Sequence, residues 1–526
     1  MEIGDKMALS AEQPRTSLSV VSARRSLQWV NNQAFYSMLP APYLSFYQNW
    51  VKEWLQWYDG FVPYIHGGQN GLLSTNIGTT LVNRSSDCVV GGSIMFSNAR
   101  TPNVYTVDDK GKKVGKALDF ISNKWDKECD FRGVIKKAIK NAYAGGFSLL
   151  KLNNGGGRLW VDTIRADRFF FERNARGQIR KVVSFISFYD NTIKKENSKH
   201  YGLIEERRFE EIGAFGQEIP VVEYKIYETN SQIQYFNASD NSIRWEDLPK
   251  DVRKAFKSEY GFRLNKPQAM NGFSDLGCYV ITGSDEISNC PQFGMGESLL
   301  ANILTYLYEY EFYNTAFNTD MYLARGRVMI PKPMQSPNAR AGAQPSGLDD
   351  FAFTKYETLT TDAQKPEAIQ FALRSAEWKE ARNILLESIA TGIGLSVSTL
   401  ASYLNDGSNR TAREVSAEES ATTLFIENAR RRFEKPINDC IATVLRFYGY
   451  TDDVEVRWSR AGMSNTTVLV DTLSRAIESG LISRKKAHSL YNYDDDESQN
   501  AEDFALVEKE RQGQEMQFDA KDYYGE

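Results

Sequence analysis

The stretch that most constrains how this chain can fold is residues 294–324, with the sequence GMGESLLANILTYLYEYEFYNTAFNTDMYLA. Apolar and aromatic side chains recur in it at steps of three and four residues, which places them on one face of a single helix. They are Leu299, Ile303, Tyr306, Tyr310, Tyr313 and Phe317. About thirty helical residues would span on the order of 45 Å, which is longer than most helices inside one compact domain.

Other apolar residues of this stretch widen the face until more than one side of the helix must meet a neighbour. They are Leu300, Leu304, Leu307 and Tyr308. Two interpretations stay open from these residues alone: a long core helix within one subunit, or a strut that packs against copies of itself. The polar residues Glu309, Glu311, Asn314 and Asp320 exclude a membrane span.

The composition is that of a soluble globular protein, with 41% apolar and 25% charged residues. A chain of 526 residues is too long for one core, so we expect three or four domains. We find neither an apolar run typical of a secretory signal nor a membrane span, and we expect an intracellular or particle-bound product. The net charge is −5 and acidic residues concentrate after Asp494, so no region indicates tight nucleic-acid binding.

Before the long helix, the pattern changes from helical to alternating. An aromatic-rich amphipathic helix is predicted from Tyr43 to Tyr58, a second over 76–90 and a third over 131–143 with Asp130 as its N-cap. From Gly146 onwards, period-two runs predict a mainly antiparallel sheet that opens with a hairpin around NNGGG at 153–157. The expected strands are 147–152, 158–164, 168–171, 179–189, 204–209 and 221–227, followed by a charged helix over 245–260.

After the long helix, two short strand-like runs at 327–330 and 351–360 flank an Ala/Gly/Pro/Ser loop. A helix is predicted over 372–391, ended by Gly392-Ile-Gly394, and a Ser/Asn/Gly-rich loop follows it. The longest helical pattern runs over 411–448, and Pro436 should kink it near Arg432. The remaining expected elements are a strand at 454–458 and helices over 467–479, from Ser483 to Tyr491, and over 501–511.

No catalytic constellation emerges from the sequence. The three histidines, His66, His200 and His488, are isolated from one another, and the five cysteines show no metal-ligand spacing. The nearest approach to a nucleotide loop has Lys110 where glycine is needed and Ala117 where Ser or Thr is needed. Acidic runs at 349–350 and 494–497 are typical of solvated surface, so we expect no cofactor, no metal site and no enzyme.

The order of these parts resembles that of the portal proteins of tailed bacteriophages. The best local matches are GESLL at 296–300, Gly392-Ile-Gly394 with NDGSNRTA at 405–412, and SGLIS at 479–483. WLQWYDG at 54–60 and AGGFS at 144–148 resemble the family's wing. Where such proteins often carry Ser-Gly before the long helix, this chain has Asn409-Arg410-Thr411, a departure that leaves the loop conformation open.

The resemblance implies an α+β, portal-type subunit of several domains, with long stem helices, a mixed α/β wing, a small β-containing clip and a helical crown. Its parts would be an N-terminal arm (1–40), the wing (41–293 and, as a long kinked helix and strand, 411–462), the stem helices (294–323 and 374–393), the clip (324–373), the tunnel loop (394–410) and the crown with its acidic tail (463–526).

Site residues follow from the same resemblance. The six apolar residues that open this section would pack the stem between subunits, and Arg325, Arg327 and Lys332 would lie in the clip. The tunnel loop would present mostly hydroxyl and amide groups to the DNA channel, suited to weak, sequence-independent phosphate contacts. These residues are Ser396, Ser398, Ser402, Asn405, Asp406, Ser408, Asn409 and Arg410.

The resemblance also implies partners. We expect a homo-oligomeric ring of about twelve subunits at a capsid vertex of the virion, assembled in the host cytoplasm, through which double-stranded DNA is packaged and ejected. Expected partners are the terminase large subunit, the major capsid and scaffolding proteins and a head-tail adaptor, with no membrane. The alternatives are another phage head-tail ring component, such as an adaptor or scaffold, and a nucleic-acid enzyme.

Overall fold

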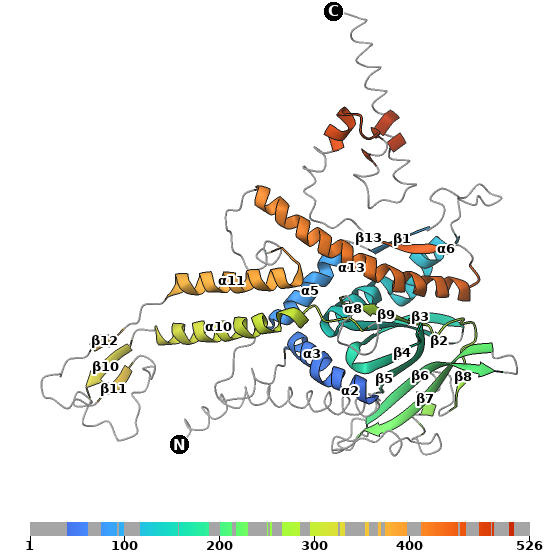
Figure 1. The fold of residues 1–526 in the computed structure, drawn as a ribbon, viewed down its shortest axis with the longest axis horizontal. Helices are drawn as coiled ribbons and strands as arrows, with labels where there is room; N and C mark the ends of the chain where they lie inside the picture. Colours follow the sequence, from blue (N-terminus) through green and yellow to red (C-terminus); the bar gives the residue numbers. More distant parts are fainter. Residues whose placement is uncertain are drawn as a thin grey trace, which may run out of the picture. The chain divides into compact units, whose positions relative to one another are not determined.

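The computed structural model describes most of the regular elements of the chain (Figure 1). The described residues are 39–60, 75–91, 94–98, 116–155, 157–188, 200–212, 217–229, 250, 253–254, 266–284, 295–324, 327–331, 353–356, 367–369, 374–396, 412–450, 453–458, 473–484, 487–488, 504–505 and 507–509. Two units emerge: unit 1 holds residues 1–58, 79–301 and 419–526, and unit 2 holds residues 59–78 and 302–418. Helices and strands both contribute, which confirms the α+β class.

In its described residues, unit 1 contains a three-stranded and a five-stranded antiparallel sheet, a two-stranded antiparallel ribbon, and the helices that pack on them. The three-stranded sheet has the order β3(Arg158–Arg165), β2(Phe147–Gly155), β9(Cys278–Thr282). The five-stranded sheet has the order β4(Phe169–Arg173), β5(Ile179–Phe188), β6(His200–Ile212), β7(Gln217–Thr229), β8(Gln268–Ala269). Helix α8(Phe131–Gly145) packs on β2, β3 and β9. The predicted β2–β3 hairpin and the predicted strands β4, β5, β6 and β7 of the larger sheet are confirmed, whereas the sequence does not predict β8.

The helices of unit 1 bury the aromatic residues that the sequence singles out. The first predicted helix is continuous but has three parts: α2(Ala41–Phe46), a π-helical turn η1(Tyr47–Val51) and α3(Lys52–Asp59). Trp54 is buried, and the hydroxyls of Tyr43 and Tyr47 donate to the carbonyl oxygens of Phe171 and Phe169 in strand β4. Helix α5(Ile77–Val90) is confirmed as well, and it ends at Gly91 with positive φ.

Four further elements of unit 1 were not predicted over 94–129. They are β1(Ile94–Asn98), α6(Lys116–Asp119), the π-helix η2(Phe120–Trp125) and α7(Asp126–Cys129). Strand β1 pairs antiparallel with the predicted strand β13(Val454–Trp458), so segments about 360 residues apart in the chain form one ribbon. Helix α13(Ala412–Phe447) continues through Pro436, and the kink near Arg432 stays a prediction.

The prediction that Asp130 caps α8 is wrong. Asp130 has φ 51° and ψ 50°, in the left-handed region, and makes no side-chain cap hydrogen bond. The carboxylate of Asp126 takes the role instead, because its Oδ1 accepts from the backbone N–H of Arg132 at 3.0 Å. Arg132 also pairs with Asp126 through its guanidinium at 2.7 Å. The acceptor Asp126 lies six positions before the donor Arg132, which is outside the usual capping pattern.

Unit 2 consists mainly of a helical hairpin and a small sheet. Helices α10(Leu304–Leu323) and α11(Ser375–Ile393) lie side by side (Figure 1). Between them in the chain come β10(Arg327–Pro331), β11(Phe353–Tyr356) and β12(Glu367–Ile369), which form a sheet of order β11-β10-β12. The sequence predicts the first two of these strands and helix α11 with its Gly394 cap, which has positive φ. It does not predict β12.

The prediction of one helix over residues 294–324 is wrong at its beginning. Helix α10 starts at Leu304, after a 3-10 turn η5(Ala301–Ile303). Residues 296–299 instead dock on the end of α8, where Ser298 Oγ donates to the carbonyl oxygens of Tyr143 and Ala144 at 2.8 and 2.9 Å. Leu299 N donates to Tyr143 O at 2.9 Å. These bonds satisfy carbonyl oxygens that the end of α8 would leave unpaired. Because the GESLL segment makes these bonds, it does not form part of the long helix.

Candidate functional site

The α10–α11 hairpin is the candidate site, because it contains most of the described residues with a predicted role. Its two helices contact each other beside the start of α10 and again towards the end of α10. At the first end, Gly392 leaves room for Ile303: a Cβ on Gly392 would lie 2.4 Å from the Ile303 side chain. At the other end, the ring of Trp378 on α11 contacts Tyr313 at 4.6 Å and Phe317 at 5.9 Å between ring centroids.

A polar cluster accompanies Trp378. The carboxylate of Asp320, in the last turn of α10, accepts from the Arg374 guanidinium at 2.8 Å and from the Trp378 indole N–H at 3.0 Å. The Arg374 hydrogen bond lowers the pKa of Asp320. The guanidinium also lies 5.8 Å from the centroid of the Trp378 ring. Asp320 and Arg374 are 54 residues apart in the chain, and the sequence offers no periodic signal that would join them.

A second buried carboxylate ties α10 to the segment before α5. Glu311 is only 1% exposed, and both of its oxygens accept from the Thr75 backbone N–H, at 3.0 and 2.9 Å. The Thr75 hydroxyl donates to Glu311 Oε1 at 2.8 Å. Hydrogen bonds to an ionised group are about twice as strong as those between neutral groups. Thr75 is therefore held at a fixed position along α10.

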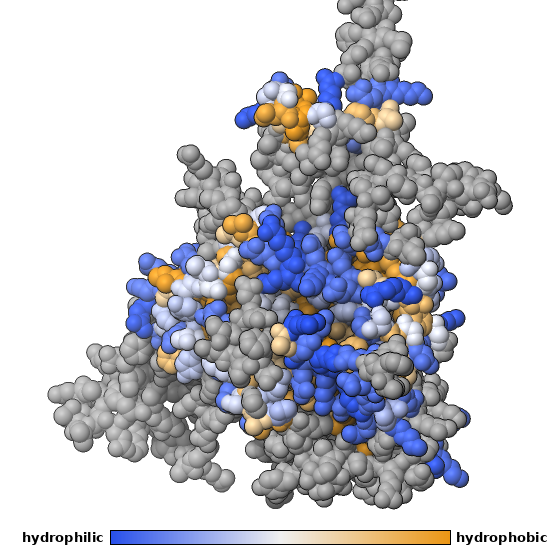
Figure 2. All heavy atoms as spheres, turned by 45° about the vertical axis from the view of Figure 1, so that its right-hand side comes forward, coloured by the Kyte–Doolittle hydropathy of each residue, from blue (hydrophilic) through white to orange (hydrophobic). Residues whose placement is uncertain are grey.

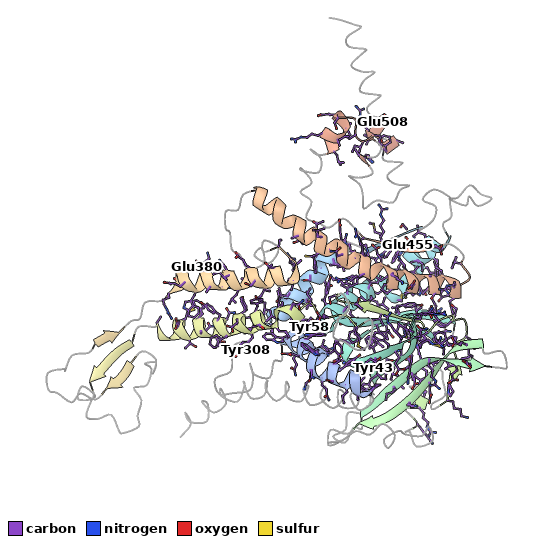
Figure 3. All side chains as sticks on the ribbon, viewed as in Figure 1. Tyr43, Tyr58, Tyr308, Glu380, Glu455 and Glu508 are labelled. Atoms are coloured by element: carbon purple, nitrogen blue, oxygen red, sulfur yellow. The ribbon has the colours of Figure 1, made fainter. Side chains whose placement is uncertain are left out.

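The predicted stem residues mostly contact their own chain. Ile303 and Tyr310 are buried, Tyr313 and Phe317 pack on Trp378, and Leu299 is half-buried. Tyr306 is 42% exposed. Another side of α10 carries Tyr308, which Figure 3 labels, and Phe312 four residues further on. These two side chains are 39% and 50% exposed. Whether any of these residues contacts another subunit stays a prediction.

The remaining predicted site residues are only partly within the described chain. Ser396 is buried directly after α11. The rest of the tunnel loop lies outside the described residues, as do Arg325 and Lys332, and Arg327 is described only as the first residue of β10. The candidate nucleotide loop also lies outside, apart from Lys116 and Ala117 at the start of α6. So do the acidic runs at 349–350 and 494–497.

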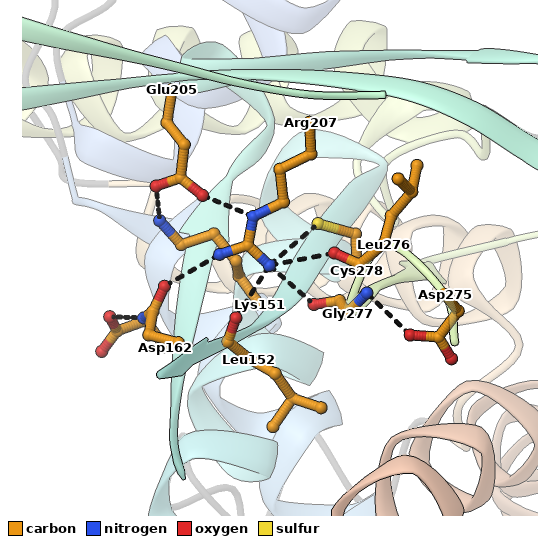
Figure 4. A network of polar contacts seen from close by, with 10 residues as sticks. Lys151, Leu152, Asp162, Glu205, Arg207, Asp275, Leu276, Gly277 and Cys278 are labelled. Atoms are coloured by element: carbon orange, nitrogen blue, oxygen red, sulfur yellow. Dashed lines mark hydrogen bonds and ion pairs between the residues drawn. The ribbon is translucent and has the colours of Figure 1, made fainter. Parts of the chain in front are cut away.

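Unit 1 contains a buried ionic network that sequence analysis missed (Figure 4). Lys151 Nζ pairs with Glu205 Oε2 at 2.7 Å, and Arg207 Nε donates to Glu205 Oε1 at 2.5 Å. A guanidinium nitrogen of Arg207 donates across to the carbonyl oxygens of Leu152 and Leu276, at 2.7 and 3.0 Å. Burial alone would raise the pKa of Glu205, but Arg207 and Lys151 outweigh it and hold that pKa at about 2.

The network joins the three-stranded and the five-stranded sheet of unit 1. Lys151 and Leu152 belong to β2 of the three-stranded sheet, whereas Glu205 and Arg207 belong to β6 of the five-stranded sheet. All three charged side chains are at most 4% exposed. In the sequence, Lys151 and Glu205 occupy positions of alternating strand patterns that would ordinarily be apolar. A charged residue at such a position is the signal by which sequence analysis could have found the network.

A pocket of about 600 Å³ lies beside this network in unit 1. It is lined by charges of both signs, among them the exposed pair Arg180 and Glu218. The Asp275 carboxylate in its wall already accepts from the Gly277 N–H, the Tyr279 hydroxyl and the Thr443 hydroxyl, at 2.8, 3.0 and 2.7 Å. The lining therefore offers no consistent charge pattern for a ligand.

The described residues also bear on metal sites, membranes and thiols. Among them, no three His, Cys, Asp or Glu side chains group as metal ligands would, and no helix combines the length and apolarity of a membrane span. Cys88, Cys129, Cys278 and Cys440 carry free thiols. Burial raises the pKa of Cys129 to about 12 and that of Cys278 to about 11, which fits packing residues rather than nucleophiles.

Comparison with known proteins identifies the family. A search of curated protein sequences finds no match. The model of a family described as "Phage portal protein, SPP1 Gp6-like" matches residues 69–515 of the 526. This range includes parts of both units, the α10–α11 hairpin and the predicted tunnel loop. The chain therefore belongs to the SPP1 Gp6-like family of phage portal proteins.

Proposed function

We propose that the chain forms a ring of about twelve subunits at one capsid vertex, through which double-stranded DNA enters and leaves the phage head. Family membership supports a ring-forming portal protein of the virion. The observation that carries the proposal is the α10–α11 hairpin. One side of α10 packs against α11 within the same chain. Another side of α10 leaves Tyr308 and Phe312 exposed.

In this proposal, α10 and α11 are the stem helices, and Tyr308 and Phe312 contact the neighbouring subunit. Two aromatic side chains at positions i and i+4 form one contiguous patch on a helix. In a closed ring, every subunit presents one surface to the next and receives another in return, so the patch is covered in each copy.

Phe312→Asp tests the stem interface. A carboxylate placed in an apolar contact between subunits is costly, so we expect monomers or open fragments in place of rings. Because Phe312 is 50% exposed in the single chain, the circular dichroism spectrum of the variant should match that of the wild type. Native mass spectrometry measures the assembly, and intact rings of normal stability would remove Phe312 from the interface.

The other parts of the chain take roles by family analogy. The clip, residues 324–373, docks the terminase large subunit, and the tunnel loop, residues 394–410, faces the DNA. The wing, 41–293 with 411–462, and the crown, 463–526, contact the capsid and scaffolding proteins, and a head-tail adaptor joins after packaging. Assembly takes place in the host cytoplasm. The family is structural, and we propose that this chain itself hydrolyses neither ATP nor DNA.

A further inference from the structure

We propose that Asp320 is a positioning residue that, together with Arg374 and Trp378, fixes the direction in which the clip leaves the stem. We name these three residues the Asp320 latch. The proposal rests on the proposed function in one respect, namely that the packaging motor docks on the clip. The latch itself is a claim about contacts within unit 2.

Asp320 joins the last turn of α10 to the first turn of α11. Its side chain accepts from Arg374, the residue that precedes α11, and from Trp378 in the first turn of that helix. Its backbone carbonyl accepts from Ala324 N at 2.8 Å and so closes α10. Arg374 contributes in the same way, because its carbonyl accepts from Trp378 N at 3.1 Å. Asp320 thus contributes a backbone bond at the end of α10, and Arg374 contributes one at the beginning of α11. The two side chains also bind each other.

The indole of Trp378 is held at its edge and on its surface. Tyr313 and Phe317 contact the ring from α10, and the Arg374 guanidinium lies over it. An indole N–H has one hydrogen to donate, and here it is directed at a carboxylate of the facing helix. The apolar contacts set the spacing of the helices, while the hydrogen bond to Asp320 sets the orientation of the ring.

The clip is attached to the latch by two short connections. Strand β10 begins at Arg327, three residues after Ala324, and β12 ends at Ile369, five residues before Arg374. The two strands pair with each other, with Arg327 opposite Ile369 and Met329 opposite Glu367. A chain extends by at most about 3.6 Å per residue, so connections of this length limit how far Arg327 can lie from Ala324 and Ile369 from Arg374. We therefore expect a change in the separation of Asp320 and Arg374 to shift the β10–β12 pair.

Hydrogen exchange of the assembled ring, measured by mass spectrometry, tests the latch. Asp320→Ala removes both side-chain bonds, and Trp378→Phe removes only the indole N–H while an aromatic ring remains. The matched control is Glu380→Gln, which removes an exposed charge on α11 that is not one of the three latch residues (Figure 3). Loss of hydrogen bonds to a charged group corresponds to about tenfold faster opening.

For Asp320→Ala we expect about tenfold faster exchange in β10, β12 and the first turn of α11. Trp378→Phe should give a smaller increase in the same segments. The α10 amides at 307–310 should exchange at the wild-type rate in every variant, as should all segments of Glu380→Gln. If exchange became faster only in the first turn of α11, Asp320 would act only as a cap of that helix. This result would overturn the proposal.

Binding of the terminase large subunit to the same rings separates the latch from the proposed function. We expect about tenfold weaker binding for Asp320→Ala and a smaller loss for Trp378→Phe. Faster exchange in β10 and β12 with wild-type binding would leave the latch standing and contradict docking on the clip. If Asp320→Ala fails to assemble, Trp378→Phe carries both measurements, and wild-type exchange in that variant would overturn the latch.

Discussion

Glu205, Lys151 and Arg207 form a buried ionic contact between two strands of unit 1. Replacing Glu205 by Gln leaves two buried cations without their anion, and removing one partner of a buried ion pair costs about 3 to 5 kcal/mol. We expect Glu205→Gln to lower the urea midpoint of unit 1 strongly. Glu218→Gln, at the exposed Arg180–Glu218 pair, is the control and should change the midpoint little. Equal midpoints for the two variants would contradict a stabilising network.

The same network predicts how stability depends on pH. The pKa of Glu205 is about 2 in the folded chain, below its ordinary value of 4.5. A carboxyl group with a lowered folded pKa contributes stability that is present above the ordinary value and lost as the pH falls towards the folded one. We therefore expect the wild type to lose stability between about pH 4.5 and pH 2 more steeply than Glu205→Gln. Parallel pH profiles from urea unfolding would argue against this assignment.

Gly146 and Gly157 offer a matched test of close packing. Both have positive φ, 91° and 81°, so alanine strains the backbone at either position. A Cβ at Gly146 would also lie 2.4 Å from the carbonyl oxygen of Gly296, whereas at Gly157 nothing lies within 4 Å. We expect Gly157→Ala to cost about 1 kcal/mol and Gly146→Ala clearly more, in thermal unfolding. Equal costs would mean that residues 296–299 do not dock tightly on α8.

At the scale of elements, one prediction concerns the role of the tunnel loop. We propose that residues 394–410 contact DNA weakly through hydroxyl and amide groups, and the alternative is an ordinary connection between two helices. Deleting residues 402–409 should leave ring assembly intact but impair packaging or retention of DNA, scored as the yield of full, infectious particles. Normal yields would favour the ordinary connection, and loss of the ring would make the loop a structural element.

Periodicity located most elements but not their partners. Helices α5, α8 and α11 and strands β4 to β7 of the larger sheet follow from local patterns, because an amphipathic face or an alternating strand is encoded within a few residues. Strand β1 depends on β13, roughly 360 positions away, and nothing local specifies that pairing. The start of α10 was misplaced for the same reason, since Ser298 bonds to carbonyls of α8.

The candidate site shows the same division. The spacing of Ile303, Tyr310, Tyr313 and Phe317 correctly indicates one packed face of a helix, but the pattern cannot say whether the neighbour is α11 or another subunit. The structure places this face against the same chain at Trp378 and Gly392. Tyr310→Asp would therefore damage the subunit itself, and Phe312→Asp is the sharper test of assembly. The contacts of Asp320 and Glu311 needed the structure, because their partners lie more than 50 residues away.

At the scale of the whole molecule, we predict that the isolated protein has no ATPase or nuclease activity. Lys110 and Ala117 break the one candidate nucleotide loop, and no histidine or carboxylate constellation replaces it. Packaging needs ATP, so a terminase partner must supply the energy. The prediction is checked by measuring the phosphate released from ATP, with and without DNA, against a mock preparation. Hydrolysis above the mock level that DNA stimulates would contradict the prediction.

Electron microscopy of the purified full-length protein in negative stain tests the central claim most directly. The account predicts closed rings of about a dozen subunits with a central hole, because the aromatic face of α10 must be covered by a neighbour in every copy. Phe312→Asp should remove these rings and leave folded monomers or open fragments. Wild-type protein that stays monomeric at concentrations where portal rings should form, or that assembles without a central hole, would contradict the account.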